Sequence, residues 1–311
     1  MTRTTVIIHP GGLGDLLLAV PAIRRIHARF PHHERVLCAN EPAARLFVQC
    51  GIIDAWISTE GRACADLFEQ GPSASGYLGK WLARCDCVVA WMQDHDGHIA
   101  EGLRKSGARE VIVASPFSVS LRRTHQSDRF CEILQAPPVD FSLFEPLVLP
   151  ADFRGRGRSC LEEVGIHPDR PFIVVHPGSG SPRKSVGIEP MASVLTQLHD
   201  RDLAPLVVEG PADREATEQL CRRIPFDIPV ARNLELGTLV AMLSYATLYI
   251  GHDSGVSHLS ALLGVRTVVL FASTDPHRWA PRGIHVTVLK GTLSSERLMA
   301  EILPVPTGCG S

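Results

Sequence analysis

Lysine is scarce in this chain of 311 residues: four of its 31 basic residues are lysine and the other 27 are arginine. The net charge is only −2, so no broad basic surface points to a nucleic-acid partner. No apolar run is long enough to cross a bilayer, so any membrane contact is expected to be peripheral. Nine cysteines form an odd set without a secretory signal, which indicates reduced thiols in a cytoplasmic protein.

Recognisable metal sites are also missing from the sequence. Cys85 and Cys87 lack a second pair at zinc spacing, so no structural zinc is expected. Asp94-His95-Asp96, with His98 close by, has the D-x-D pattern that some sugar transferases use to hold a divalent cation. No further ligands are evident around it, and polar residues often follow a strand. We therefore expect neither a metal nor a cofactor.

Short apolar runs alternate with helical patterns along the chain, beginning with the run from Thr4 to Ile8. This alternation predicts parallel sheets covered by helices on both faces, and thus an α/β fold. The stretch 137–157 breaks the rhythm with prolines and glycines and is typical of an interdomain linker. We expect one Rossmann-like domain over residues 1–150, a second over 151–311, and a cleft between their strand ends.

The most informative segment follows the apolar strand 246–250. Its small and acidic residues, from Asp253 to Gly255, lie where a strand hands over to an amphipathic helix. The free N–H groups and the dipole of that helix favour an anion, and phosphate is the usual one. Asp253 could take a sugar or ribose hydroxyl. His258, one turn after Ser254, could touch a phosphate, or it could be a core or capping histidine.

A second turn, from His176 to Lys184, also joins a buried strand to a helix. Ser179, Gly180 and Ser181 can wrap a diphosphate with backbone N–H and hydroxyl donors. Lys184 supplies positive charge for a leaving group that departs with negative charge. The alternative is a surface loop with solvated charges.

The turn from His9 to Asp15 is the third candidate. Its glycines, among them Gly14, let the backbone approach a ligand closely. Asp15 falls at the start of a helix, where it could be a general base for an acceptor hydroxyl, an N-cap, or both. Pro21 should kink that helix. The turn has neither the G-x-G-x-x-G spacing of a dinucleotide fingerprint nor a Walker A lysine.

Two weaker candidates complete the set. Glu215 ends the turn that starts at Val208 and could hold ribose hydroxyls, although acids are common at helix starts. Arg122 and Arg123 could grip an anionic acceptor, or could equally form a solvated helix face.

Taken in order, these segments resemble glycosyltransferase family 9, the ADP-heptose:lipopolysaccharide heptosyltransferases. The similar stretches are Gly12–Asp15 with Pro21, His176–Lys184, Gly210–Glu215, Asp253–Leu259, Phe271–Pro276 and Trp279–Pro281. The resemblance implies a GT-B fold, in which two Rossmann-like domains have parallel sheets facing a central cleft. The N-terminal domain then binds the acceptor and the C-terminal domain binds the donor. A helix near 294–303 is expected to pack back on one of the two domains, and a return to the N-terminal domain is left open.

The same resemblance implies an inverting, metal-independent transfer of a heptose from ADP-heptose to a lipopolysaccharide core acceptor, a glycolipid or oligosaccharide. The reaction would take place at the inner face of the inner membrane. Asp15 matches the base, and Lys184 matches a lysine on the donor phosphates and sugar. Further donor contacts match Gly14, Ser179, Gly180, Ser181, Glu215, Leu234 on the adenine, Asp253, Ser254, Gly255 and His258.

Some positions depart from the family pattern. Val186 stands where relatives commonly have tryptophan, and Ser254 replaces a usual threonine but keeps the hydroxyl. In the turn that starts at Val208, the acid of the family pattern matches Glu215 in one alignment, whereas another alignment places Arg214 there. A transferase with another donor or acceptor, an inactive nucleotide-sugar-binding protein and a nicotinamide oxidoreductase remain as alternatives, and the missing dinucleotide fingerprint disfavours the last.

Overall fold

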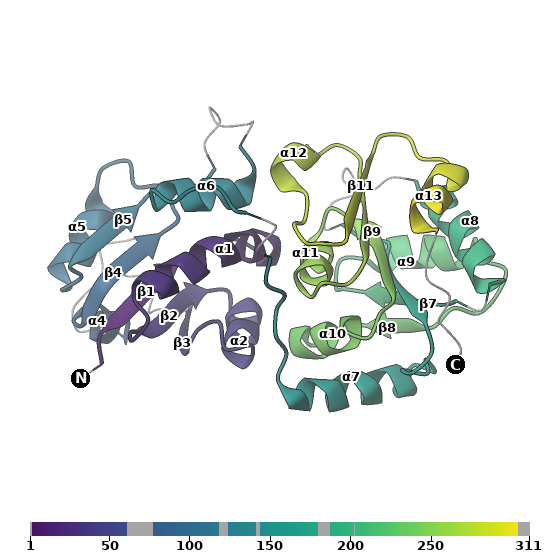
Figure 1. The fold of residues 1–311 in the computed structure, drawn as a ribbon, viewed down its shortest axis with the longest axis horizontal. Coiled ribbons are helices and arrows are strands. Elements are labelled where there is room, and N and C mark those ends of the chain that lie inside the picture. Colours follow the sequence, from purple (N-terminus) through teal and green to yellow (C-terminus); the bar gives the residue numbers. More distant parts are fainter. Residues whose placement is uncertain are drawn as a thin grey trace. The chain divides into compact units, whose positions relative to one another are not determined.

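The computed structural model describes residues 2–60, 77–117, 124–140, 144–179, 187–201 and 203–303. The chain divides into two compact units, Met1–Asp140 and Phe141–Ser311, and Figure 1 labels their elements. The domain boundary expected from the sequence lies at 150/151, whereas the two compact units divide the chain at 140/141. Within the described ranges, no helix has both the length and the apolar character needed to span a membrane.

A five-stranded parallel sheet forms the centre of the first unit. In spatial order its strands are β3 (Ala55–Ser58), β2 (Glu34–Ala39), β1 (Thr4–Ile8), β4 (Cys85–Ala90) and β5 (Glu110–Val113). The helices are α1 (Leu13–Arg29), α2 (Glu41–Gln49), α4 (Tyr77–Leu82), α5 (His98–Lys105) and α6 (Gln126–Ile133). Strand β1 is buried along its whole length, as expected for a central parallel strand covered on both faces. The strand order reverses between β1 and β4, and ligands bind at the carboxyl edge beside such a reversal.

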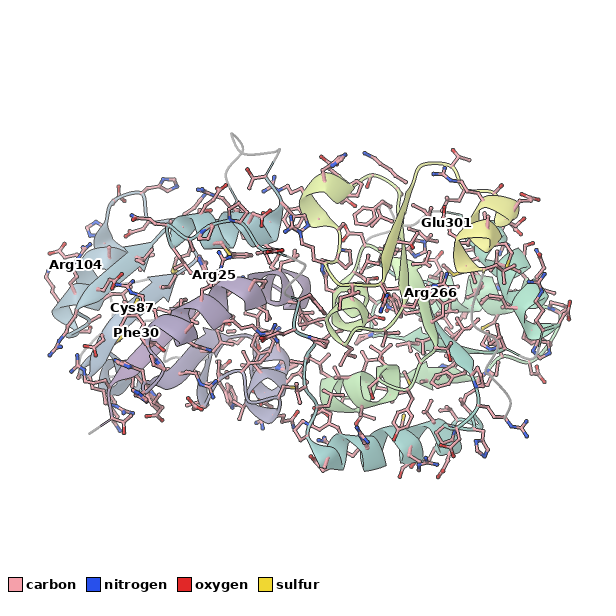
Figure 2. The ribbon with its side chains drawn as sticks, in the orientation of Figure 1. Arg25, Phe30, Cys87, Arg104, Arg266 and Glu301 are labelled. Atoms are coloured by element: carbon pink, nitrogen blue, oxygen red, sulfur yellow. The ribbon has the colours of Figure 1, made fainter. Side chains whose placement is uncertain are left out.

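Helix α1 starts five residues after β1 ends, because the turn between them is short. Pro21 lies inside the helix, which nevertheless runs continuously from Leu13 to Arg29. Its apolar stripe, from Leu16 to Ile26, is buried against the sheet and fixes the helix in spite of the missing backbone donor. Arg25, labelled in Figure 2, donates to the carbonyls of Pro137 and Pro138, at 3.0 Å for Pro138. The start of the expected linker is therefore attached to the first unit.

The second unit has a six-stranded parallel sheet. Its spatial order is β11 (Val286–Lys290), β10 (Thr267–Phe271), β9 (Leu248–His252), β6 (Phe172–His176), β7 (Ala204–Glu209) and β8 (Val230–Arg232). The helices are α7 (Ala151–Glu163), α8 (Ile188–His199), α9 (Arg214–Cys221), α10 (Leu236–Leu243), α11 (Gly255–Leu262), α12 (Pro276–Trp279) and α13 (Ser295–Ile302). The order reverses between β9 and β6, and the turns after these two strands are the two phosphate candidates. The predicted α/β architecture with parallel sheets is confirmed.

The linker prediction is wrong over residues 151–157, where the structure has helix α7. Gly155 and Gly157 lie inside this helix, and neither breaks it. A side chain at Gly157 would put its Cβ 2.6 Å from the Ala241 carbonyl oxygen, so this glycine lets α7 pack closely against α10. Close helix packing, not chain flexibility, explains a glycine at position 157.

Helix α13 belongs to the core of the second unit. Leu298 and Ile302 join the buried cluster that includes Leu195 of α8. Arg266 donates to the carbonyl of Glu301 at 2.9 Å, which fastens the end of α13 beside the start of β10 (Figure 2). Of the two domains left open for this helix, the described contacts place it on the second unit.

Candidate functional site

Three turns at the carboxyl edge of the second sheet are joined by one chain of hydrogen bonds. His176 ends β6, and its Nε2 lies 2.9 Å from the Asp213 carboxylate, which comes from the turn between β7 and α9. The other ring nitrogen, Nδ1, lies 3.3 Å from Oγ of Ser254, in the turn between β9 and α11. Because β9, β6 and β7 are neighbours in the sheet, the fold itself brings the three residues together.

Two glycines make room for the Asp213 carboxylate. A Cβ at Gly178 would lie 1.8 Å from one of its oxygens, and a Cβ at Gly210 would lie 2.8 Å from the other. The Gly210 N–H donates to the carboxylate at 2.9 Å. The hydrogen bond from His176 lowers the pKa of Asp213, with smaller help from this N–H, so the buried carboxyl stays ionised near neutral pH.

The N-terminus of α11 presents backbone N–H groups at the same edge. Ser254 is the N-cap, with an extended backbone, but its side chain makes no capping bond. The first intrahelical bond runs from the His258 N–H to the Ser254 carbonyl at 3.4 Å, so the N–H groups of 255–257 precede the helical ladder. Such an end favours an anion through its donors and its dipole.

A second set of hydrogen bonds, made by the hydroxyls of Tyr249 and Ser257, stabilises the start of this helix. The Tyr249 hydroxyl lies 3.0 Å from Ser257 Oγ, and Ser257 donates to the His252 carbonyl. Burial raises the pKa of Tyr249, so its hydroxyl stays protonated and can donate to Ser257. Gly251 permits this contact, because a Cβ there would lie 2.3 Å from the Tyr249 oxygen. The turn is therefore fixed before any ligand binds.

The structure places several of the predicted donor residues at different positions of the second unit, and others lie outside the described residues. Ser179, Asp253 and His258 are buried at the carboxyl edge, beside Gly255, the first residue of α11. Leu234 is half-buried between β8 and α10. Gly180, Ser181 and Lys184 lie outside the described residues.

Glu215 lies on an exposed face of α9, where it accepts a hydrogen bond from Gln219 at 3.1 Å. The acid that turns into the buried cluster is Asp213, two positions earlier. Neither Asp213 nor His176, which links the turns, is among the site residues predicted from the sequence. The nearest signal was the glycine at 210, three residues before the carboxylate that it accommodates.

Asp15 lies in the first turn of α1, at the carboxyl edge of the first sheet. The N-cap of this helix is Gly12, so the alternative that Asp15 is itself the N-cap is wrong. A carboxylate in the first turn is favoured in its ionised form by the helix dipole. Gly11 lies close against it, since a Cβ there would be 3.2 Å from the Asp15 carboxylate.

His9 sets the conformation of the turn that leads to Asp15. Its Nδ1 accepts the Gly11 N–H at 3.1 Å. The ring packs between Trp91 and Phe130, with centroids 5.8 and 5.5 Å away. Burial lowers the pKa of His9 to about 4, so the imidazole is neutral near pH 7.

Asp94, from the D-x-D stretch, has a structural role at the start of a helix. Asp94 accepts the N–H groups of Ile99 and Ala100, at 3.2 and 2.9 Å, and so stabilises the start of α5. Across the described ranges, no three His, Cys, Asp or Glu side chains are grouped as metal ligands would be. Arg122 and Arg123 lie outside the described residues.

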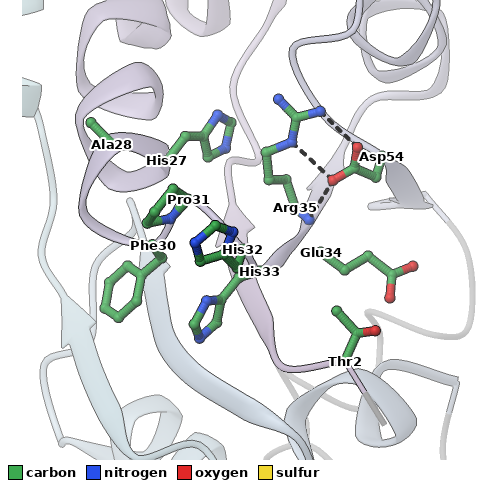
Figure 3. A pocket seen from close by; sticks show the side chains of 10 residues that line it. All are labelled: Thr2, His27, Ala28, Phe30, Pro31, His32, His33, Glu34, Arg35 and Asp54. Carbon is green, nitrogen blue, oxygen red and sulfur yellow. Dashed lines mark hydrogen bonds and ion pairs between the residues drawn. The ribbon is translucent and has the colours of Figure 1, made fainter.

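The described surface includes two hollows, neither of them lined by His176, Asp213 or Ser254. One of about 580 Å³ opens between the start of α8 and the carboxyl ends of β10 and β11, beside Ser273 and Thr292. The other, of about 790 Å³, lies near the end of α1 and is lined by His27, Arg35 and Asp54 (Figure 3). Arg35 binds Asp54 there at 2.6 Å and lowers the pKa of that carboxyl. This second hollow is about 18 Å along α1 from Asp15, so it is separate from the candidate site.

Residues 99–300 match the profile of the family described as glycosyltransferase family 9 (heptosyltransferase). A putative glycosyltransferase of Haemophilus influenzae is 27% identical over 127 residues, which cover 39% of this chain and only 36% of that protein. Lipooligosaccharide heptosyltransferase 2 of Campylobacter jejuni is 23% identical over 290 residues, which cover 89% of this chain and 83% of that protein.

Solved structures show the same fold. A family 9 glycosyl transferase from Veillonella parvula has a TM-score of 0.76 at 19% identity, covering 93% of this chain and 86% of its own. ADP-heptose lps heptosyltransferase II of E. coli has a TM-score of 0.71 at 16% identity, covering 97% of this chain and 98% of its own. These matches confirm the expected α/β architecture with two parallel sheets, that of the GT-B heptosyltransferases.

Proposed function

The chain belongs to glycosyltransferase family 9, and from this membership we propose that it moves a heptose from ADP-heptose to a lipopolysaccharide core acceptor. The observation that carries the proposal is the carboxyl edge of the second sheet. There the uncapped N-terminus of α11 and buried Asp253 and His258 form a ready site for a nucleotide diphosphate. The finer parts of the proposal are the donor, the acceptor and the role of each residue.

The reaction needs a base and a stabilised leaving group. The acceptor hydroxyl attacks the anomeric carbon from the face opposite ADP, and Asp15 takes its proton as the new C–O bond forms. The bond from the anomeric carbon to the phosphate oxygen breaks, and ADP leaves with the bonding electrons. The N–H groups at the start of α11 and the Lys184 ammonium stabilise that charge, so the transfer is inverting and needs no cation.

The choice of an adenine nucleotide is supported by relatives that share the fold. One solved structure is described as E. coli heptosyltransferase WaaC with ADP, with a TM-score of 0.68 and 14% identity. Another is described as the heptosyltransferase TibC in complex with ADP-D-beta-D-heptose, with a TM-score of 0.52 and 15% identity. We infer that Leu234 packs on the adenine and that Asp253 takes a sugar hydroxyl.

A donor panel tests the proposal. The purified protein is incubated with ADP-heptose, ADP-glucose or UDP-glucose, with or without a heptose-free core glycolipid, and nucleotide release and product mass are measured. We expect transfer from ADP-heptose alone and only with the acceptor present. Efficient transfer from another nucleotide sugar would replace the donor assignment, and ADP binding without any transfer would favour an inactive nucleotide-sugar-binding protein.

The role of Asp15 is tested by Asp15→Asn, which keeps the shape of the side chain but removes the base. We expect turnover to fall by about a thousandfold, while the affinity for ADP is retained. Glu296→Gln is a matched control, because Glu296 is also an acid in the first turn of a helix but lies on α13. Turnover of Asp15→Asn equal to that of the control would remove Asp15 from the mechanism.

A further inference from the structure

The chain of hydrogen bonds from Asp213 through His176 to Ser254 takes no part in the bond-making and bond-breaking steps proposed above, although the resemblance counts Ser254 among the donor contacts. We propose that His176, held by Asp213, is a positioning residue that keeps the Ser254 hydroxyl off the N-terminus of α11. The first N–H groups of that helix then stay open for the donor diphosphate. This role rests on the proposed function, because it requires a diphosphate at that helix end.

The direction of each hydrogen bond follows from the carboxylate. Ionised Asp213 can only accept, so the hydrogen on the facing ring nitrogen of His176 is on Nε2. When the imidazole is neutral, Nδ1 is an acceptor and Ser254 donates its hydroxyl hydrogen to it. The Ser257 oxygen, 3.4 Å away, is a further hydroxyl beside Ser254. The Asp213 carboxylate thereby helps to orient the hydroxyl of a residue in another turn.

Ser254 does not make the capping hydrogen bond that is usual for a serine at the start of a helix. A serine at an N-cap ordinarily accepts the N–H of the second or third helical residue. Ser254 has the extended backbone of an N-cap without that bond. The N–H groups of Gly255, Val256 and Ser257 precede the helical ladder and need an acceptor. Released from His176, the hydroxyl would compete with the diphosphate for these donors.

Two substitutions of His176 test the roles of its two ring nitrogens separately. In His176→Gln the terminal amide lies where Nε2 was, so it can still donate to Asp213 but has nothing to offer Ser254. In His176→Asn the amide oxygen lies where Nδ1 was, so it can still accept from Ser254 but leaves the Asp213 carboxylate without its partner. Each variant is measured as the full chain, by ADP titration calorimetry and by thermal unfolding.

We expect the two readouts to rank the variants in opposite orders. His176→Gln should bind ADP about fivefold more weakly than the wild type, the equivalent of one N-cap bond. His176→Asn should bind ADP more tightly than His176→Gln, yet should unfold at the lower temperature because a buried carboxylate has lost its donor. A purely structural histidine would instead give ADP affinities that follow thermal stability.

A double variant tests whether His176 acts through Ser254, and it applies even if His176→Asn does not fold. We expect Ser254→Ala to leave ADP binding of His176→Gln as tight as before or tighter, because the competing hydroxyl is gone. Independent losses that multiply in the double variant would overturn the positioning role. Wild-type protein that does not bind ADP would instead count against the proposed function, which keeps the two failures apart.

Discussion

The same tripeptide, His-Pro-Gly, lies at the carboxyl end of an inner strand in each sheet, starting at His9 after β1 and at His176, the last residue of β6. Both histidines are buried. His9 gives Nδ1 to the Gly11 N–H, and its Nε2 has no hydrogen-bond partner among the residues that the structure describes. His176 has a carboxylate on one nitrogen and a hydroxyl on the other.

The difference comes from side chains that lie far away in the sequence. His9 packs against Trp91 and Phe130, so burial dominates and holds the ring neutral, as a rigid support for its turn. His176 meets Asp213, so its ring becomes a polar link between turns. An identical local sequence in an identical topological place thus takes its chemistry from the elements beside it.

The largest expected effect is a difference in the stability lost when the glycine of each tripeptide, Gly178 or Gly11, is replaced by alanine. In Gly178→Ala the new Cβ would lie 1.8 Å from an Asp213 carboxylate oxygen and must displace that group from its partner. We expect the second unit to lose about 3 kcal/mol of unfolding free energy. In Gly11→Ala the Cβ meets His9 Cε1 at 2.6 Å, and a packed ring can shift, so about 1–2 kcal/mol should be lost.

Urea unfolding of each variant measures both losses. Gly155→Ala is the control, because nothing lies within 4 Å of a Cβ there and alanine favours a helix interior, so this variant should gain about 0.5–1 kcal/mol. Equal stability of Gly178→Ala and wild type would mean that the Asp213 carboxylate does not occupy the space beside Gly178.

The next effect is the pH dependence of the first unit. The pKa of His9 is lowered to about 4 in the folded chain and returns to about 6.5 on unfolding. Between these values the unfolded state binds more protons, so stability must fall as the pH falls. From pH 7 to pH 5 the unfolding free energy should drop by about 2 kcal/mol through His9 alone.

His9→Asn should remove that part of the pH dependence while keeping an acceptor for the Gly11 N–H. His27 is the comparator in the same unit, because burial lowers its pKa to about 4 as well. His27→Asn should remove a similar and separate share. An unchanged slope in His9→Asn would show that the ring takes up a proton in the folded state.

Much of the fold could be predicted from local patterns. The apolar run predicted at Thr4–Ile8 forms a strand with those bounds in the structure, because an apolar run between turns leaves few alternatives. Helix α7 was missed, because Gly155 and Gly157 signal a break locally, and the contact with Ala241 that explains Gly157 is a tertiary one.

The candidate site was predictable in its turns but not in its hydrogen bonds. The turns after β6 and β9 are predicted by their glycine and serine residues, which lie between an apolar strand and a helix. The partner of His176 is 37 positions away, and nothing in the local pattern distinguishes Asp213 from the acids near it. Which acid faces inward is decided by the geometry of the turn, and that geometry depends on the space at Gly178.

The smallest expected effect is on the stability of the second unit at acid pH, where Asp213 takes up a proton. The hydrogen bond with His176 lowers the folded pKa of Asp213, so its contribution is present above the unfolded value of about 4 and is lost as the pH falls through the folded pKa. Asp213→Asn should remove up to about 1 kcal/mol per pH unit from the acid limb below pH 4, measured by urea unfolding at pH 5, 4 and 3. Asp213→Asn should leave the pH dependence between pH 7 and 5 unchanged, which is the range in which His9→Asn acts. An acid limb identical to that of the wild type would mean that the carboxylate does not distinguish His176 from His9.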